Sequence, residues 1–367
     1  MMASRRARRW TLASAWLAVL LVLAVGCSVG GDTATPTVVP TPSPAPRPTA
    51  EPPASVAAWY VAAQAQEPDA AVRVRADLTA NEIDALSRAF ARRYPAVTIN
   101  WRRGNDADLL QDTLNEARAG GGDWDIYIGD SAPSLKTARL ALRWTPPEGR
   151  TVPVDLVDPE GAWIALAATY HVVQFNTDQV PSDAVPTSYE ALQHPGYFGR
   201  IAIEDVNLLW LRGLDETRGR EATSTLVQAL AQQAVTFRRD ARTLVAFITA
   251  GQQAVAIDAR LDVVERERQA GGKTLWIAYD PVIAQPLAMV VSAASDRPNA
   301  TRLVGNFLLS MDAQTILASA GRIPSRADVE PDPQNLVRGI QPRILLPPEG
   351  AAEREYRQLW SDLWGRR

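Results

Sequence analysis

Most of the sequence switches repeatedly between the patterns of strands and helices, and this alternation constrains the fold more than any other feature. Residues 72–76 alternate apolar and charged side chains, as a half-buried strand does. A capping box at 79–82 then begins a segment whose apolar residues recur at helical spacing. Residues 97–101 and 125–129 predict two further strands, with a leucine-rich helix between them. The β-α-β-α-β order predicts an α/β fold, in which a mostly parallel sheet is flanked by helices on both faces.

The first strand departs from this pattern in one respect. Arg73 and Arg75 alternate with apolar residues along it. A strand that is covered on both faces is normally apolar along its whole length, so the parallel-sheet prediction does not explain these two arginines.

The same alternation resumes in the second half of the sequence. The apolar runs and periodic segments there predict a second α/β lobe at about residues 176–280. The expected strands are 163–175, 200–204, 254–258, 274–279 and 287–291. The expected helices are 240–250, a segment around 303–308, and 312–320, and a further capping box stands at 187–190.

The N-terminus has the pattern of an export signal. Arginines at positions 5, 6, 8 and 9 precede an uncharged, largely apolar run that ends in Ala24-Val25-Gly26-Cys27. A transmembrane anchor needs about 20 apolar residues, and this run is shorter. Its last four residues resemble the lipobox of bacterial lipoproteins, in which the cysteine is acylated and becomes the first residue. The resemblance predicts a signal peptide at 1–26 and lipidation of Cys27, with an uncleaved anchor as the alternative. Either outcome places the rest of the chain outside the cytoplasmic membrane.

The charge of the exported part excludes some partners. The full chain has a formal net charge of −3, and loss of residues 1–26 removes four arginines and no acid, which leaves −7. A net negative extracellular domain argues against nucleic acid and anionic lipid as partners.

A proline-rich segment follows Cys27. Residues 28–56 contain eight prolines together with Thr, Ser and Ala, a composition that favours extended conformations and cannot build a core. We expect residues 27–69 to form a lipidated, semi-rigid tether, with a proline-rich docking ligand as the alternative. Within this range, residues 57–67 suit either a short helix packed on the domain or a loose segment.

The motifs of common enzyme classes are missing from the sequence. It has no G-x-S-x-G elbow, phosphate-binding loop, G-x-G-x-x-G fingerprint or H-E-x-x-H motif. The single cysteine is assigned to the lipid, and His171 and His194 are expected to be structural. Asp123-Trp124-Asp125 has the D-x-D form of some metal sites, but it fits a turn followed by a strand better. No two carboxylates are singled out as a glycosidase pair. We therefore expect no enzyme, no cofactor and no resident metal.

Four stretches of the sequence, in this order and spacing, resemble one protein family. They are Phe90–Pro95; Glu116–Gly120 with Trp124–Tyr127; Phe175–Thr177 with Pro186–Leu192, His194–Pro195 and Gly199–Ile201; and Phe307–Gln314 with Gly321–Val329. From about residue 70 to its end, the chain resembles the extracellular solute-binding proteins of ABC importers. The similarity is to their type II branch, which includes ferric-iron binders.

The resemblance implies a two-lobed fold in which solute binds in the cleft between the lobes. Lobe 1 would begin with 70–175, lobe 2 would be 176–280, and 281–367 would hold the hinge return, the completion of lobe 1 and C-terminal helices. Two crossing strands, 163–175 and 283–291, would join the lobes. The implied function is a monomeric, lipid-anchored receptor that delivers a small molecule or ion to an ABC permease. A surface-anchored hydrolase and a ligand-presenting sensor component without transport are the alternatives.

Candidate ligand-binding residues follow from the same fold. In open parallel sheets, ligands lie beyond the carboxyl ends of the strands, where helix N-termini present free N–H groups. The Thr79 capping box and the Asn105/Asp106 cap would direct two helix starts at one cleft. Tyr170 and His171 would lie at the hinge. The candidates are Asp77, Thr79, Arg103, Asn105, Asp130, Ser131, Tyr170, His171, Asp205, Asp258 and Arg260.

The ligand class stays open at this point. Ferric binders of the family commonly use adjacent tyrosines in the second lobe, whereas this sequence has Asp258-Ala259-Arg260 at the corresponding strand end and no Tyr-Tyr pair. The resemblance therefore does not support a bound metal ion. Arg103 and Arg260 would suit an anion. The candidate aspartates would suit a cation or a polyol; they are Asp77, Asp130, Asp205 and Asp258.

Overall fold

The computed structural model describes residues 54–67 and 71–365, all of which fall within the unit Glu51–Arg367. The predicted signal peptide at 1–26, the lipidated Cys27 and the proline-rich part of the tether lie outside the described residues. None of the described helices is long and apolar enough to span a membrane.

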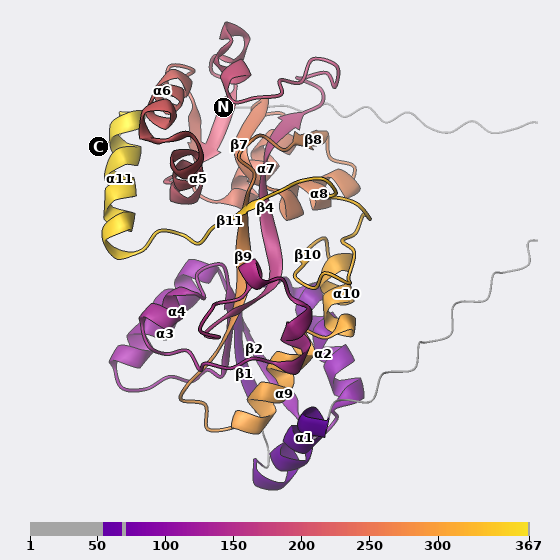
Figure 1. Ribbon diagram of the computed structural model, residues 1–367. Coiled ribbons are helices and arrows are strands. Elements are labelled where there is room, and N and C mark those ends of the chain that lie inside the picture. The colour runs from indigo at the N-terminus through magenta and orange to yellow at the C-terminus, as the bar shows by residue number, and fades with distance from the viewer. Residues whose placement is uncertain (1–53, 68–70, 366–367) are drawn as a thin grey trace, which may run out of the picture. The chain divides into compact units, whose positions relative to one another are not determined.

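Two lobes are built on one continuous path of strands, in the order β2-β1-β3-β9-β4-β7-β5-β6 (Figure 1). The first three strands are parallel and belong to lobe 1, and the last three are parallel and belong to lobe 2. Between them, β9 and β4 pair antiparallel and run from one lobe into the other. The bounds are β1 Ala71–Ala76, β2 Thr98–Arg103, β3 Ile126–Gly129, β4 Ile164–Asn176, β5 Ile201–Glu204, β6 Thr236–Arg238, β7 Val255–Arg260 and β9 Ile283–Val291. The predicted fold class, with mostly parallel sheets and two crossing strands, is confirmed.

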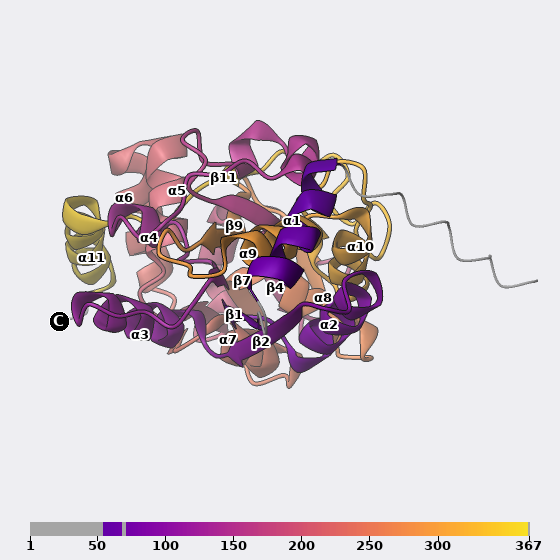
Figure 2. The ribbon, with the colours of Figure 1, turned by 90° about the horizontal axis from the view of Figure 1, so that it is seen from below.

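In lobe 1, helices cover both faces of the sheet. One face packs its apolar side chains against α1, α2, α9 and α10, and the other packs against α3 and α4. Figure 2 shows α2 and α3 on opposite sides of the strands. The apolar residues that recur at helical spacing in the sequence therefore face the sheet, as the α/β pattern predicts. The helices are α1 Ala54–Gln66, α2 Ala80–Arg93, α3 Asp106–Arg118, α4 Ser134–Thr137, α9 Pro298–Leu308 and α10 Met311–Ser319.

Lobe 2 has its own core and is completed by the end of the chain. After α10, the chain pairs β10 with β4 and β11 with β9, and then ends in α11, which packs on α5 and α6 (Figure 1). Trp360 and Trp364 of α11 contact Trp210 of α5, with ring centroids 6.4 and 6.5 Å apart. The remaining elements are α5 Leu208–Arg218, α6 Arg220–Ala231, α7 Ala241–Thr249, α8 Leu261–Gln269, β8 Thr274–Ile277, β10 Ile323–Pro324, β11 Arg343–Ile344 and α11 Gly350–Trp364. Short 3-10 turns lie at Pro147–Thr151, Val154–Leu156, Glu190–Gln193 and Pro195–Tyr197.

Several boundaries differ from the sequence-based expectation. Of the two alternatives for residues 57–67, the packed helix is the one observed: Val56 and Ala63 of α1 are buried in the lobe 1 core, and α1 contacts α9. Residues 54–67 therefore belong to lobe 1, whereas the tether was expected to extend to residue 69. Helices α5, α6 and α8 were not predicted. The sequence at 187–190 gives only a 3-10 turn, in which Ser188 accepts a hydrogen bond from the backbone N–H of Ala191. Strand β7 continues to Arg260, and α8 follows it with no linker.

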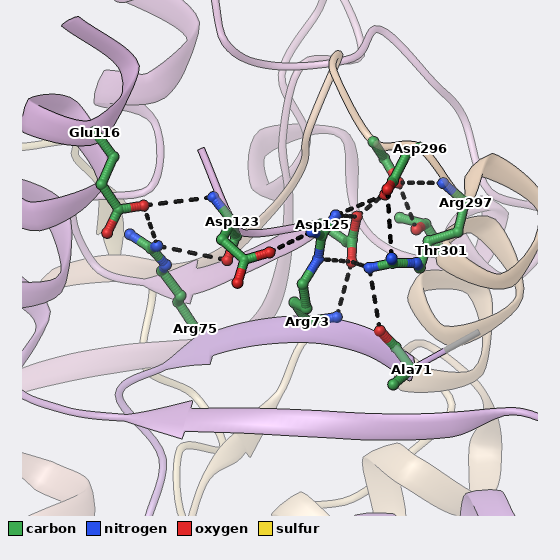
Figure 3. Close-up of polar contacts among 10 residues, drawn as sticks. Ala71, Arg73, Arg75, Glu116, Asp123, Asp125, Asp296, Arg297 and Thr301 are labelled. Carbon is green, nitrogen blue, oxygen red and sulfur yellow. Dashed lines mark hydrogen bonds and ion pairs between the residues drawn. The ribbon is translucent and has the colours of Figure 1, made fainter. Parts of the chain in front are cut away.

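The two unexplained arginines of β1 have buried or partly buried acidic partners (Figure 3). Arg75 is almost fully buried, donates to Thr113 Oγ1 at 2.7 Å and pairs with Glu116, both on α3. Arg73 pairs with Asp125 at 2.9 Å. The alternation of β1 thus reflects an ionic layer beneath α3 and the loop before β3, instead of a solvent-exposed face.

Asp125 lies at the centre of a polar cluster that also contains Arg73, Ser295 and Arg297. It is fully buried and accepts hydrogen bonds from the backbone and side chain of Arg73, from Ser295 Oγ and from Arg297. Burial by itself would raise the pKa of Asp125, but the hydrogen bonds and charge of Arg73 outweigh this and lower the pKa. The cluster joins β1 to the turn after β9, two segments that are far apart in the sequence.

Asp125→Ala is expected to destabilise the protein by about 3 kcal/mol, because it leaves two partly buried guanidinium groups without their shared carboxylate. The measurement is urea unfolding followed by tryptophan fluorescence. Asp123→Ala and Asp296→Ala are matched controls, since both acids pair with the same Arg73 but are 78% and 65% exposed. Each control should cost less than about 1 kcal/mol. Equal costs for the three variants would contradict a structural role of the buried pair.

Candidate functional site

A polar cavity of about 380 Å³ lies between the carboxyl ends of the strands of the two lobes. Lobe 1 contributes the residues that follow β1 and β3 and the start of α3, and lobe 2 contributes the end of β5 and the starts of α7 and α8. This is the position that the open-sheet argument predicts. The lining residues are Asp77, Asn105, Asp106, Ala107, Asp130, Glu204, Asp240, Ala241, Arg242, Arg260, Asp262, Val263 and Arg266.

Four of the candidate residues line this cavity. Asp77, Asn105 and Asp130 come from lobe 1, and Arg260 comes from lobe 2. Asn105 also caps α3 by accepting the backbone N–H of Ala107 at 3.0 Å. The strand-end reasoning therefore brought together residues that are up to 183 positions apart in the chain.

Three further candidates lie near the strand ends but not on the cavity wall. Thr79 forms the capping box of α2 with Glu82, and it lines a separate groove between α2, α8 and α10. Ser131 turns its backbone N–H to Asp106. Arg103 is the last residue of the edge strand β2 and is exposed. Sequence reasoning placed them at the right edge of the sheet, but it could not say which side chains turn inward.

The remaining four candidates also lie away from the lining. Tyr170 packs against the lobe 1 core, and Asp205 has its backbone N–H bonded to the carbonyl of Arg238 at 2.7 Å. His171 and Asp258 pair with each other, at 2.8 Å between Nδ1 and Oδ2, and both side chains are buried.

The His171–Asp258 pair fastens a crossing strand to lobe 2. Asp258 Oδ2 also accepts from Asn207 Nδ2 at 2.6 Å, which links β4, β7 and the start of α5. Burial would lower the pKa of His171, but the adjacent Asp258 carboxylate outweighs it and raises the pKa. Asp258 holds a left-handed backbone conformation, with φ of 62°. These two residues are therefore structural at the hinge in this conformation.

Asp106 is a cavity residue that was not among the candidates. Its Oδ1 accepts from Tyr127 Oη at 2.9 Å, and its Oδ2 accepts from the backbone N–H of Ser131 at 2.9 Å. Gly129 makes room for it, because a Cβ at Gly129 would stand 1.8 Å from Asp106 Oδ1. Burial, with the nearby charge of Asp130, raises the pKa of Asp106 to about 6. The one feature of the sequence that pointed to this contact was Gly129, since a glycine at the end of a buried strand leaves room for a neighbouring side chain.

Glu204 is another acid of the lining that was not among the candidates, as are Asp240 and Asp262. It ends β5 and faces the cavity from lobe 2. Burial raises its pKa to about 7, although the neighbouring His171 acts in the opposite direction. Asp258, Arg260 and Asp240 supply the other charges around it, of which Arg260 lowers its pKa and the two aspartates raise it.

Ion pairs cross the cleft between the lobes. Arg260 Nη1 of lobe 2 lies 2.7 Å from Asp130 Oδ2 of lobe 1, and both side chains are less than one-fifth exposed. Arg260 also contacts Asp262 at 3.3 Å and Thr169 Oγ1 at 3.2 Å. A second pair, Arg242 with Asp77 at 3.2 Å, joins α7 to the end of β1, but the arginine is 59% exposed. The structure is thus a conformation in which the two walls touch.

A buried arginine, Arg322, makes a further contact between the lobes at one edge of the cleft. Arg322 Nε lies 2.7 Å from Glu82 Oε1 on α2, and its Nη1 lies 3.5 Å from Asp262 Oδ2 on α8. All three side chains are less than 5% exposed. Burial would raise the pKa of Glu82, but the charge of Arg322 outweighs it and lowers the pKa. Within the described part of the chain, no group of three or more His, Cys, Asp and Glu side chains is placed to hold a metal ion.

The family of the chain follows from a match over more than half of its length. The model of the bacterial extracellular solute-binding protein family matches residues 145–344. The chain belongs to this family. The match spans both crossing strands and all the described strands of lobe 2. No curated protein matches the chain.

Solved structures of solute-binding proteins share the fold. Iron-bound HitA from Pseudomonas aeruginosa is 18% identical with a TM-score of 0.68, covering 80% of this chain and 99% of HitA. The substrate-binding protein of an ABC transporter from Agrobacterium tumefaciens is 14% identical with a TM-score of 0.70, covering 80% and 95%. AfuA from Actinobacillus pleuropneumoniae, with fructose-6-phosphate bound, is 14% identical with a TM-score of 0.60, covering 81% and 97%. At these identities the likeness shows the fold alone. The members of the family are binding proteins, and the fold is that of type II periplasmic binding proteins.

Glu204→Gln is expected to stabilise this solute-binding protein above about pH 7 and to have no effect near pH 4. The unfolded carboxyl ionises near its ordinary pKa of 4.5, whereas the folded protein keeps the proton up to about pH 7. Folded-state stability therefore falls as the pH rises between these values, by roughly 1 to 3 kcal/mol. Urea unfolding at about pH 4, 6 and 8 measures the effect. Glu221→Gln, at an exposed position on α6, is the control and should show no pH-dependent difference. A pH-independent gain in Glu204→Gln would count against the buried-carboxyl explanation.

Proposed function

We propose that the protein is a lipid-anchored extracellular receptor that binds a small solute in the cleft between its lobes and delivers it to an ABC importer. The observation that carries the proposal is the cavity, because its walls come from both lobes and the lobes are joined by extended strands. A ligand in such a cavity contacts both walls only when they are close together. Membership of the solute-binding family supports the same role.

The mechanism is a hinge movement about the crossing strands. β4 and β9 are the long strands that enter both lobes, so rotation of one lobe against the other bends these segments and the β11 pairing beside β9. The Arg260–Asp130 and Arg242–Asp77 pairs cross the cleft in this structure, so an opening movement would separate their charges. A solute that adds contacts to both walls shifts the population further toward the closed arrangement. The closed form is the one that we propose docks on the permease.

We further propose that the receptor acts as a monomer on the outer face of the cytoplasmic membrane, or on the periplasmic side of an envelope membrane. Acylation of Cys27 would provide more than one chain on one residue, which exceeds what a single chain gives for stable anchoring. The proline-rich segment after it would keep the folded unit away from the bilayer surface. A net charge of −7 after processing disfavours nucleic acid as a partner.

A bound solute is expected to raise the melting temperature and to reduce the radius of gyration of the receptor. Ligand at about 100 times its Kd stabilises the native state by about 2.7 kcal/mol, because only the native state binds. That corresponds to a shift of roughly 5 °C for a protein of this size. Differential scanning fluorimetry with a panel of sugars, amines, carboxylates, phosphate esters and metal salts, followed by small-angle X-ray scattering of each hit, provides the measurement. If no compound changes either quantity, the receptor function is wrong, and turnover of a hit would instead favour a hydrolase.

Cys27→Ser is expected to release the receptor from the membrane fraction. Cys27 is the only cysteine in the sequence. Without its thiol, no thioether to a diacylglycerol group can form. Fractionation of expressing bacteria and intact-mass measurement of the purified chain check this. Ser28→Ala, next to the modified position, is the control and should stay lipidated. A Cys27→Ser chain that remains membrane-bound, with its first 26 residues intact, would show an uncleaved anchor.

A further inference from the structure

The two walls of the cleft differ in charge. Nine of the thirteen lining residues are charged, six of them acids and three of them arginines. On the lobe 1 wall, every charged residue is an acid, namely Asp77, Asp106 and Asp130. All three arginines come from lobe 2, where they lie among three more acids. The cavity as a whole therefore has three more carboxyl groups than guanidinium groups.

The arginines of the wall are already engaged by carboxylates. Arg260 contacts Asp130 and Asp262, and Arg266 contacts Asp262 at 3.3 Å. Arg242 contacts Asp77 across the cleft. An anionic ligand would have to compete with these carboxylates for Arg242 and Arg260, whereas Arg266 has one buried nitrogen, Nη1, without a partner among the described residues. This single nitrogen stands against six carboxyl groups in the lining. The geometry therefore does not favour an anion.

Three carboxyl groups of the wall are short of donors or of positive charge. The donors to Asp106 among the described residues are neutral, namely Tyr127 Oη and the Ser131 N–H. Asp130 uses Oδ2 for Arg260, and its Oδ1 is buried without a hydrogen-bond partner among the described residues. Glu204 accepts no hydrogen bond from any residue in the described ranges. A buried carboxylate oxygen without a donor is costly, so Asp130 gains from a ligand that supplies an N–H group. Asp106 and Glu204 gain from a positive charge on the same ligand.

The titration behaviour of two of these acids agrees with a deficit of positive charge. The pKa values of Asp106 and Glu204 are raised to about 6 and about 7. Asp130 is the charged neighbour that raises the pKa of Asp106, and the charged groups that face Glu204 are His171, Asp258, Arg260 and Asp240. A cation in the cavity would lower both pKa values.

The size and composition of the cavity narrow the kind of cation. A volume of about 380 Å³ accommodates a molecule of several heavy atoms and is far larger than a bare ion needs. The lining contains charged and small residues and no aromatic ring. Quaternary ammonium ligands are held mainly by aromatic faces, whereas carboxylates bind cations that donate hydrogen bonds.

We propose that the solute is a small organic cation with N–H donors, a primary amine or a guanidinium compound, held by Asp106 and Asp130 of lobe 1 and Glu204 of lobe 2. This inference rests on the receptor function proposed above, and it names the ligand class of the same cleft. The amine or guanidinium group supplies the donors that Asp130 Oδ1 and Glu204 lack, and its charge faces the lobe 1 wall. Because the groups come from both lobes, such a ligand also adds contacts that close the cleft.

Isothermal titration calorimetry on the detergent-solubilised full chain tests the ligand class. The donor-bearing cation probes are putrescine, spermidine, agmatine and ethanolamine, and choline is the cation without N–H donors. Glucose, glucose 6-phosphate, citrate and ferric nitrilotriacetate represent the other classes. We expect binding by at least one donor-bearing cation, at least about tenfold tighter than choline. Near pH 6.5 that binding should release protons, seen as a dependence of the heat on the buffer, because the bound cation favours the ionised acids.

Variants on both walls test the placement. Asp106→Asn and Glu204→Gln should each weaken the cation probe by about tenfold or more and reduce the proton release. Asn at 106 keeps an acceptor for the Ser131 N–H, and Tyr127 can still donate to the carbonyl of residue 106, as it does at 2.8 Å. Asp108→Asn is the matched control, since Asp108 lies in the same first turn of α3 but is exposed. It should change affinity by less than about threefold. The melting temperature of each unliganded variant reports whether it is folded.

The outcomes separate this inference from the receptor function. Preferred binding of glucose, an anion or the ferric complex would overturn the cation assignment and leave the receptor function standing. Cation binding that Asp106→Asn and Asp108→Asn weaken equally, or proton uptake in place of release, would also overturn it. If no probe of any class binds, the receptor function itself fails, and the ligand class fails with it.

Discussion

The contact between Arg260 and Asp130 is the interaction on which the geometry of the cleft depends. It joins the end of a lobe 2 strand to the residue that follows a lobe 1 strand, and Asp262 and Thr169 engage the other donors of the same guanidinium. Removing an arginine from water is costly unless carboxylates and other acceptors replace the solvent. Asp262 belongs to lobe 2 itself, so Arg260 has one carboxylate partner within its own lobe, and Asp130 of lobe 1 adds the second. Contact between the walls therefore completes the set of acceptors around this buried charge.

Two other carboxyl groups of the cleft, unlike Asp130, have no arginine partner among the described residues. Asp106 and Glu204 are held in partly buried positions with raised pKa values, and within the described ranges neither forms an ion pair with an arginine. Such groups lower the stability of the folded chain at neutral pH. Binding sites commonly keep unfavourable groups of this kind, because a ligand recovers the lost free energy. In the proposed site, Asp130 takes part in both roles: its Oδ2 pairs with Arg260 across the cleft, and its Oδ1 has no hydrogen-bond partner among the described residues.

The sequence predicted the fold well and the site in part. Strand-end reasoning found Asp77, Asn105, Asp130 and Arg260, because local pattern fixes where a strand ends. It missed Asp106 and Glu204, since an acid in the first turn of a helix and an acid at a strand end are both ordinary features. Their significance arises from burial and from neighbours contributed by distant segments. The same limit explains why the sequence did not account for the two arginines of β1 or predict α5, α6 and α8 of lobe 2. The apolar faces of these helices become evident only from their packing.

Helix α11, which has 15 residues, contributes Trp360 and Trp364 to the aromatic core of lobe 2. Trp360 and Trp364 are the side chains that close this core over Trp210, so lobe 2 has an open side until α11 packs on α5 and α6. Between α6 and α11 the chain passes back through lobe 1, where it forms α9 and α10. The two lobes are therefore interleaved along the chain, and neither can complete its core as an independent, consecutive domain.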